Sequence, residues 1–519
     1  NLECPEVWAL LGEGKTVGVF QLESRLGQTI SAKLKPENIE QLSDLIAVIR
    51  PGCLDSYMDD QDGKSKNITS HYIDRKNNSD QVTYYHESLE EILSSTFALL
   101  IFQEQAMAIV QKLADFDLSQ ADVLRRAIGK KKVSDMQDAK KDFMEGCKKK
   151  KLVDDETAAH IFSWIESSQR YSFNKSHSVA YAMNAYLAVY AKVHFPHQFF
   201  TSSLYHTRNS PKPFERIQEI VSDLRYFDID ILPPSIHHLH KNFQLIDNTI
   251  YFGITNIKGI GDSVYNKLTK RINAVCKKLG KTIDQLTWME TLIFIFSHIP
   301  STGVVAMINV GVFSHLKKDR KQLRYEYEKY SLLSKDKEQS WVQDNFAQYN
   351  WDSLSDCIST IVQSPIGKKG VCANKTRHAR MKEMVQALAS PSYNLKDSAA
   401  FIATEEESLL GCPITYSHVE ACDKDEATCN CQDFIKDVGQ QTCWIAAQID
   451  RKHEITTKTN KLMCFLTCSD IHGTLDNIVV FPEVYEKSRA LLFNRNTIML
   501  VGNRGKDKGS LIVKKIYQI

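Results

Sequence analysis

The spacing of apolar residues changes along the chain, and each change marks a different type of predicted structure. Across residues 1–205, apolar side chains recur every three or four positions, as they do on amphipathic helices. The stretches 87–116, 117–132 and 134–150 show this most clearly, and the last two open with Asp or Ser, residues that often cap helices. The N-terminal region is therefore predicted to be largely helical.

Further along, the pattern becomes mixed and then β-like. Two prolines in 232–242 predict a connection, 243–256 alternates as short strands, and helical spacing returns up to residue 325. Residues 326–440 are polar with poor periodicity and are interpreted as a mixed linker. After Cys443, five short β-rich runs follow, with one helical interval before the fourth. This order predicts a small five-stranded barrel of the OB kind, although other small barrels fit the pattern too.

Length and composition narrow the class of protein. A chain of 519 residues is too long for one hydrophobic core, so three or four domains are expected. No apolar run is long enough to span a bilayer, and the thirteen cysteines lack disulfide-framework spacing, which together favour a cytoplasmic protein without a membrane partner. Because the first residue is Asn1 rather than Met, we expect a processed or excised fragment, or a start inside a longer gene.

Local charge is more informative than the net charge of +2. Residues 121–151 hold eleven basic residues against five acidic ones, including the adjacent Arg125 and Arg126 and a lysine run that starts at Lys130. Most such runs are solvated helix faces. A dense run can also bind phosphate, and adjacent arginines on a helix point about 100° apart, so they could reach two different phosphates.

The segment YSFNKSHSVAYA at 171–182 places polar groups before a small, apolar, helix-like stretch. Asn and Ser commonly cap a first helical turn, and from these residues alone a cap is the favoured interpretation. The alternative is an anion-binding site, in which Lys175 and His177 join a helix N-terminus around a phosphate.

The segment KGIGDSVYNKL at 258–268 is the sharpest short signal. Gly259 and Gly261 predict the hairpin of a helix-hairpin-helix, whose backbone approaches DNA phosphates closely, with Lys258 beside it. An ordinary glycine-containing turn is the alternative. A second copy around 300–316 has weaker support.

The predicted barrel carries aromatic and basic residues of the kind that bind single strands. The proposed single-strand contacts are Trp444, Lys458 and Lys461. A place in the barrel core is an equal alternative for Trp444 and the better explanation for Phe465.

Three groups that resemble metal sites are discounted. Asp228 and Asp230 lack a further acid, and the acidic loop at 59–62 lacks a closing Glu. The spacing of Cys422, Cys429 and Cys431 fits a closed zinc site poorly, so free thiols are favoured there. No catalytic residue and no metal ligand is assigned to this chain.

Several motifs occur in an order that resembles the bacterial family C DNA polymerases, the family of DNA polymerase III alpha subunits. The motifs are GKTVGVFQLES (14–24), DLIAVIRPG, YYHESLEEIL, IFQEQAM, LRRAIGKKK, YSFNKSHSVAYA, ILPPSI and IKGIG, followed by the barrel. The resemblance covers nearly the whole chain and is weak over 326–440. It implies fingers at 1–205, a connection and tandem helix-hairpin-helix domain at 206–325, a mixed region at 326–440 and an OB barrel at 441–519.

The resemblance also implies roles for individual residues. The incoming dNTP triphosphate is expected at Arg125 and Arg126, and the nucleotide or the primer end near five further residues: Lys130, Asn174, Lys175, His177 and Ser178. The helix-hairpin-helix is expected to bind duplex DNA and the barrel the single-stranded template. Phosphoryl transfer concentrates negative charge that such cations stabilise.

Family members carry PHP and palm domains before the fingers, and the palm aspartates hold two Mg²⁺ ions. This sequence begins after that point, so we expect the chain alone not to polymerise DNA and to need a second chain with PHP and palm, from a split or phage-encoded replicase in a bacterial cell. The sliding clamp and clamp loader are left open as partners, because the peptides at 339–342 and 343–346 fit a clamp motif poorly. The alternative is a non-catalytic DNA-binding or regulatory protein derived from the same scaffold.

Overall fold

The computed structural model describes residues 2–59, 63, 65–78, 82–130, 133–168, 171–367, 370–436, 442–457, 459–505 and 509–519, without the side chains of 127–130 and 133–136. The chain divides into two compact units, Asn1–Phe199 and Phe200–Ile519. Each unit has its own core and is described by itself.

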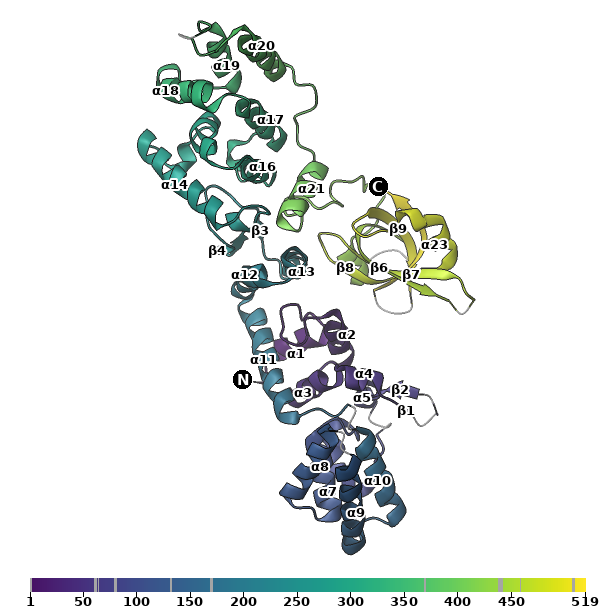
Figure 1. Ribbon diagram of the computed structural model, residues 1–519. Helices are drawn as coiled ribbons and strands as arrows, with labels where there is room; N and C mark the ends of the chain where they lie inside the picture. Colours follow the sequence, from purple (N-terminus) through teal and green to yellow (C-terminus); the bar gives the residue numbers. More distant parts are fainter. Residues whose placement is uncertain are drawn as a thin grey trace. The chain divides into compact units, whose positions relative to one another are not determined.

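The first unit is almost entirely helical (Figure 1). Its helices are α1 (Pro5–Gly12), α2 (Arg25–Leu34), α3 (Ile39–Val48), α4 (Pro51–Asp55), α5 (Ile68–Asn77), η2 (Glu87–Leu89), α6 (Glu90–Leu93), η3 (Ser94–Thr96), α7 (Gln103–Ala114), α8 (Leu118–Lys130), α9 (Val133–Lys150), α10 (Asp155–Ser168) and α11 (Lys175–His194). A short antiparallel pair, β1 (Tyr57–Asp59) and β2 (Ser65–Asn67), precedes α5. Helix α12 (Pro196–His206) begins in this unit and ends in the second.

Two groups of helices build the first unit. Helices α7, α8, α9 and α10 form a bundle whose core includes the fully buried Ile109, Phe143 and Phe162. Helix α9 approaches α7 so closely that a Cβ on Gly146 would lie 2.2 Å from the carbonyl oxygen of Ala114, so only glycine fits there. Helix α11 contacts α1 and α3, as Figure 1 shows.

The second unit begins with α13 (Pro213–Tyr226) and a small three-stranded sheet. Strand β5 (Thr249–Tyr251) pairs in parallel with β3 (Ile231–Leu232) and antiparallel with β4 (Gln244–Ile246). Asp247 and Asn248, between β4 and β5, both have positive φ, as a two-residue hairpin turn requires. The strands expected in 243–256 are thereby confirmed.

Helices then continue well into the region that was interpreted as a mixed linker. They are η4 (Thr207–Asn209), η5 (Ile254–Asn256), α14 (Asp262–Leu279), η6 (Ile283–Gln285), α15 (Trp288–Glu290), η7 (Thr291–Ile295), η8 (Phe296–His298), α16 (Ser301–Asn309), η9 (Ser314–Leu316), α17 (Arg320–Ser331), η10 (Lys335–Gln339), α18 (Ser340–Tyr349), α19 (Leu354–Gln363), α20 (Lys375–Ala389), α21 (Ala399–Leu410) and α22 (Cys431–Ile435). Residues 326–440 are thus largely helical, and the interpretation of this stretch as a linker needs that correction.

The reason is the unusual chemistry of the buried faces in this region. Tyrosines on α17, such as Tyr330, are buried, and Arg320 forms a buried ion pair with Glu406 at 2.8 Å. Glu338 is also buried and pairs with Arg377 at 2.6 Å. Polar residues therefore occupy inward positions, which hides the helical period of the apolar residues.

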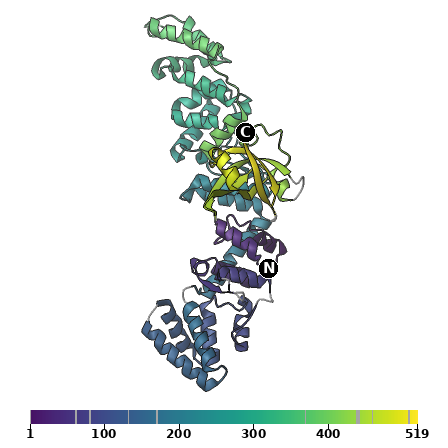
Figure 2. The ribbon, with the colours of Figure 1, turned by 90° about the vertical axis from the view of Figure 1, so that its right-hand side faces the viewer.

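The chain ends in a closed five-stranded barrel, which Figure 2 shows from a second direction together with α23. Its elements are β6 (Thr442–Thr456), β7 (Leu462–Ser469), β8 (Thr474–Val480), α23 (Pro482–Ser488), η11 (Arg489–Leu491), β9 (Thr497–Arg504) and β10 (Ser510–Gln518). The strand order is β10-β8-β7-β6-β9, with β8 and β10 parallel and the other pairs antiparallel.

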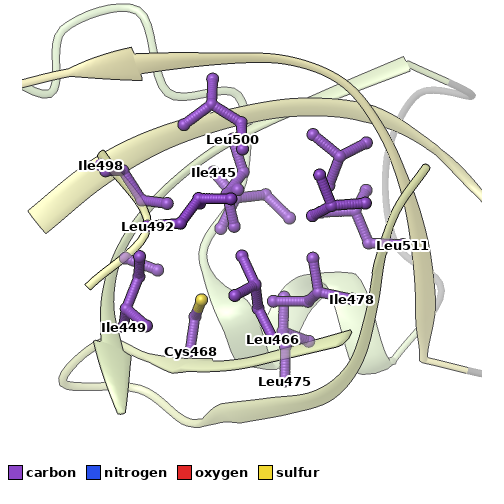
Figure 3. Packing of buried hydrophobic residues seen from close by; sticks show 14 of the residues in the cluster. Ile445, Ile449, Leu466, Cys468, Leu475, Ile478, Leu492, Ile498, Leu500 and Leu511 are labelled. Atoms are coloured by element: carbon purple, nitrogen blue, oxygen red, sulfur yellow. The ribbon is translucent and has the colours of Figure 1, made fainter. Parts of the chain in front are cut away.

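The alternation of apolar residues in the five runs produces the barrel interior. Ile445, Leu466, Ile478 and Leu500 point inward from four different strands and pack together (Figure 3). Leu511 adds a side chain from the fifth strand. The predicted fold class, mainly helical with a small C-terminal OB-like barrel, is confirmed. In the described parts of the chain, no helix is long and apolar enough to cross a membrane.

Candidate nucleotide- and DNA-binding sites

The N-terminus of α11 is capped by the residue that the sequence indicated. Asn174 has an extended backbone and its side-chain oxygen accepts a hydrogen bond of 2.8 Å from the amide of His177. Glu104 of α7 lies against the same helix end, where it accepts bonds from the Asn174 side chain at 3.0 Å and the Lys175 amide at 2.9 Å. An acidic side chain at this position satisfies free N–H groups and complements the helix dipole.

The segment before α11 is fixed to the start of α7. The amide of Phe173 donates to the carbonyl of Ile101 at 2.8 Å, and the amide of Gln103 donates to the carbonyl of Phe173 at 2.9 Å. The Arg50 guanidinium lies 5.2 Å from the centre of the Phe173 ring and donates to the Gln21 side chain at 2.7 Å. Residues from four separate motifs are thereby brought together around Phe173.

Lys175, His177 and Ser178 point to different environments. The Lys175 ammonium lies 5.7 Å from the centre of the Phe102 ring, and the exposed His177 ring lies 4.0 Å from that of Tyr181. Ser178 is fully buried and donates a 2.6 Å hydrogen bond to the carbonyl of Ser43. Lys175 and His177 thus remain accessible in part, whereas Ser178 holds α11 against α3 from the inside and its role near the nucleotide stays a prediction.

A buried carboxyl group lies close behind this helix end. Asp44 of α3 is 3% exposed and accepts a 2.7 Å hydrogen bond from the Tyr72 hydroxyl. Burial raises the pKa of Asp44 to about 7, while the Tyr72 hydrogen bond and the charge of Lys175 act in the opposite direction. Sequence reasoning missed Asp44 because it looks like an ordinary polar position on a helix.

The two arginines of α8 share one acidic partner. Asp122 is 2.9 Å from the Arg125 guanidinium and 2.5 Å from that of Arg126. Hydrogen bonds from Arg125 and then Arg126 lower the pKa of Asp122, so it stays ionised at neutral pH. Both cations are therefore held at one point in the absence of ligand. The side chain of Lys130 lies outside the described residues.

In the second unit, the glycine hairpin leads directly into α14. Gly259 has a φ of +85°, and a Cβ on Gly259 or Gly261 would meet open space, so these glycines leave the backbone accessible. Ile260 between them is buried and anchors the turn. The Lys258 amide donates to the carbonyl of Leu409 at 2.8 Å. The turn is thus rigidly held with an exposed outer edge, as backbone recognition of phosphates requires.

In the possible second hairpin around residues 300–316, the glycine at position 311 has a structural role unrelated to DNA. Gly311 has a φ of +80°, and a Cβ there would lie 2.6 Å from the Arg320 guanidinium. Arg320 donates to the carbonyl of Asn309 and to Glu406. Gly311 is therefore needed for the approach of a buried arginine.

The predicted single-strand residues of the barrel lie in different settings. Trp444 is half-buried and stacks on Tyr517, with ring centres 5.7 Å apart and planes 6° from parallel. Lys461 is exposed in the turn between β6 and β7, and Lys458 lies outside the described residues. Phe465 is half-buried rather than part of the barrel core.

The discounted metal-like groups have structural settings of their own. All thirteen cysteines are free of disulfides, and Cys431 is buried in the barrel core, where burial raises the pKa of its thiol. Cys429 is half-buried beside Cys443. Asp228 sits in a turn with positive φ.

The described residues thus combine a helical unit with a capped, cation-bearing helix end, a glycine hairpin that starts a helix, and a small closed barrel. Residues 1–151 match the family model described as the bacterial DNA polymerase III alpha subunit finger domain, and residues 228–323 match the helix-hairpin-helix motif.

Curated relatives extend this similarity. The chain is 27% identical over 507 residues to the DNA polymerase III subunit alpha of Treponema pallidum, which covers 96% of this chain and 38% of the relative. It is 26% identical over 525 residues to the DNA polymerase III subunit alpha of Staphylococcus epidermidis, which covers 99% of this chain and 42% of the relative. It is 34% identical over 329 residues to the DNA polymerase III subunit alpha of Aquifex aeolicus, which covers 62% of this chain and 26% of the relative. The chain thus spans less than half the length of these relatives, and over nearly all of its own length it is similar to DNA polymerase III alpha subunits.

Proposed function

We propose that this chain is the part of a DNA polymerase III alpha-like replicative polymerase that binds the incoming dNTP, the duplex and the single-stranded template. The observation that carries the proposal is the arginine pair on Asp122 in a region matched by the polymerase finger model. Two guanidiniums on one half-buried carboxylate form a site that a triphosphate can occupy by exchange. In that exchange, phosphate oxygens replace the oxygens of Asp122.

The end of α11 supplies the second part of this site. Lys175 and His177 would contact the nucleotide or the primer end, and Asn174 with Glu104 would keep the helix end in position. Lys130 would add charge on the same helix as the arginines. Preorganised cations of this kind stabilise the charge that develops in phosphoryl transfer without reorganising during the reaction.

The second unit would bind nucleic acid without reading its sequence. The edge formed by Lys258, Gly259 and Gly261 would bind phosphates of the duplex through backbone amides and one cation. Trp444, Lys458 and Lys461 would contact the single-stranded template by stacking and charge. Both contacts are expected to weaken as the salt concentration rises.

Polymerisation needs two Mg²⁺ ions and the carboxylates that bind them, which family members carry on the palm. We propose that a palm-bearing chain with a PHP domain supplies them, and that the assembly works in the cytoplasm of a bacterium or a phage-infected bacterium. The sliding clamp and clamp loader stay open as further partners. A non-catalytic DNA-binding role is the alternative, and such a protein would gain little from keeping a triphosphate site.

The test combines the full chain with a palm-bearing polypeptide, a primed template, dNTPs and Mg²⁺. Primer extension is expected in the mixture and not with the chain alone, and Arg125→Ala is expected to raise the KM for dNTP or lower kcat with little change in duplex affinity. Arg324→Ala is the matched control, because Arg324 pairs with Glu328 within one turn of α17 as Arg125 pairs with Asp122 within one turn of α8. Equal loss of activity in the two variants, or no nucleotide binding at all, contradicts the proposal.

A further inference from the structure

Three metal-ligating side chains meet at the start of α1 and the end of α11, away from the groups discussed above. Cys4 precedes α1, Glu6 lies in its first turn, and His194 is the last residue of α11. The Cys4 sulfur is 3.0 Å from a Glu6 carboxylate oxygen and 3.2 Å from His194 Nε2. All three ligand atoms lie within 4.8 Å of one another.

The group is held from one side and open on the other. Cys4 is buried, its amide donates to the Tyr186 hydroxyl at 3.2 Å, and the His194 ring lies 4.3 Å from the centre of the Tyr190 ring. Glu6 and His194 are exposed, which gives a metal ion a path to the sulfur.

A thiolate, an imidazole and a carboxylate are ligands that Zn²⁺ accepts together. With metal–ligand bonds of about 2.0–2.3 Å, tetrahedral geometry places ligand atoms roughly 3.3–3.8 Å apart. The Cys4–Glu6 and Cys4–His194 distances are a few tenths of an ångström shorter. Such a change lies within reach of rotation about the exposed Glu6 and His194 side chains.

We propose that Cys4, Glu6 and His194 bind a divalent transition-metal ion, Zn²⁺ in the first place, with water as the fourth ligand. The site is independent of the nucleotide- and DNA-binding function. It would fasten the beginning of α1 to the end of α11. Binding converts the Cys4 thiol to a metal thiolate, and the displaced proton passes to the solvent.

The alternative is a hydrogen-bonded triad without metal affinity, and metal titration separates the two. The full chain is freed of metal and divided into two samples. One is dialysed against Zn²⁺ to measure the number of ions bound per chain. The other is titrated with Co²⁺, whose thiolate charge-transfer and d–d absorption report a four-coordinate site. We expect one site per chain that is lost in Cys4→Ser and His194→Ala. In Glu6→Gln the affinity should fall by at least about tenfold, as when a metal site loses a supporting group.

The controls are Cys276→Ser, which changes a half-buried cysteine outside the site, and His206→Ala, which changes the last residue of α12 as His194 is the last of α11. Both should keep the site. Unchanged stoichiometry and spectrum in Cys4→Ser rule out the assignment. If that variant does not fold, Glu6→Gln decides alone, because an exposed side chain is replaced there, and unaltered affinity in it refutes the three-ligand site.

Discussion

Lys192 is a buried cation whose removal has a calculable effect on one loop. Its side chain has no exposed surface, and its ammonium donates 2.9 Å hydrogen bonds to the carbonyls of Lys15 and Val17. These carbonyls begin the loop that continues to Gln21, which contacts Arg50. Replacing Lys192 by Met keeps a side chain of similar length and removes the ammonium group that donates both hydrogen bonds.

The expected magnitude follows from two opposing contributions. Hydrogen bonds from a charged donor contribute about 1.5–3 kcal/mol each, and those from Lys192 to the Lys15 and Val17 carbonyls are of this kind. Against this, Met avoids the cost of burying an ammonium, which is several kcal/mol. Because two half-buried carbonyls lose their donor at a fully buried side chain, we expect a net destabilisation of about 1–3 kcal/mol for opening of the loop.

Hydrogen–deuterium exchange of the amides in 13–22 measures this opening directly. A loss of about 1–3 kcal/mol corresponds to exchange faster by roughly 5- to 150-fold. Lys140→Met on α9, where the lysine is exposed, is the control and should leave these amides unchanged. Equal protection in the two variants means that the Lys192 hydrogen bonds do not hold the loop.

Two further predictions concern the first unit. Because burial raises the pKa of Asp44 to about 7, the folded state binds the proton more tightly than the unfolded state, so Asp44 makes the free energy of unfolding fall as pH rises from about 4 to 7. Asp44→Asn should remove this decline, which urea unfolding at pH 5 and pH 8 measures. An equal decline in the variant and the original protein contradicts the prediction. Gly146→Ala places a Cβ 2.2 Å from the Ala114 carbonyl and should lower the free energy of unfolding by about 1–3 kcal/mol. Gly261→Ala, where φ is negative and the added Cβ meets open space, should cost less.

The sequence predicted best where a local rule fixed the structure. Alternating apolar residues produced the barrel strands, Asn174 was recognisable as a helix cap, and the two glycines marked the hairpin before α14. These features depend on neighbours within a few residues. The helices of 326–440 were missed because polar side chains such as Glu406 are buried there against Arg320.

The partners of the site residues were also missed, for a different physical reason. Asn174 and Glu104 are seventy positions apart, and Cys4 and His194 are 190 apart. No local pattern signals such a pair, because the contact exists only after α7, α11 and α1 have packed. Asp122 could have been found, since an acid three and four positions before two arginines is a recognisable helical ion pair.

Helix α11 joins features that have so far been treated one at a time. It has 20 residues and is therefore about 30 Å long, with the Asn174 cap at one end and Lys192 and His194 near the other. A continuous helix moves as a rigid body, so a tilt at one end displaces the other. Substitutions at the two ends should then be non-additive in free energy, although sites so far apart usually add, and loop 15–17 and the first turn of α11 should open as one cooperative segment.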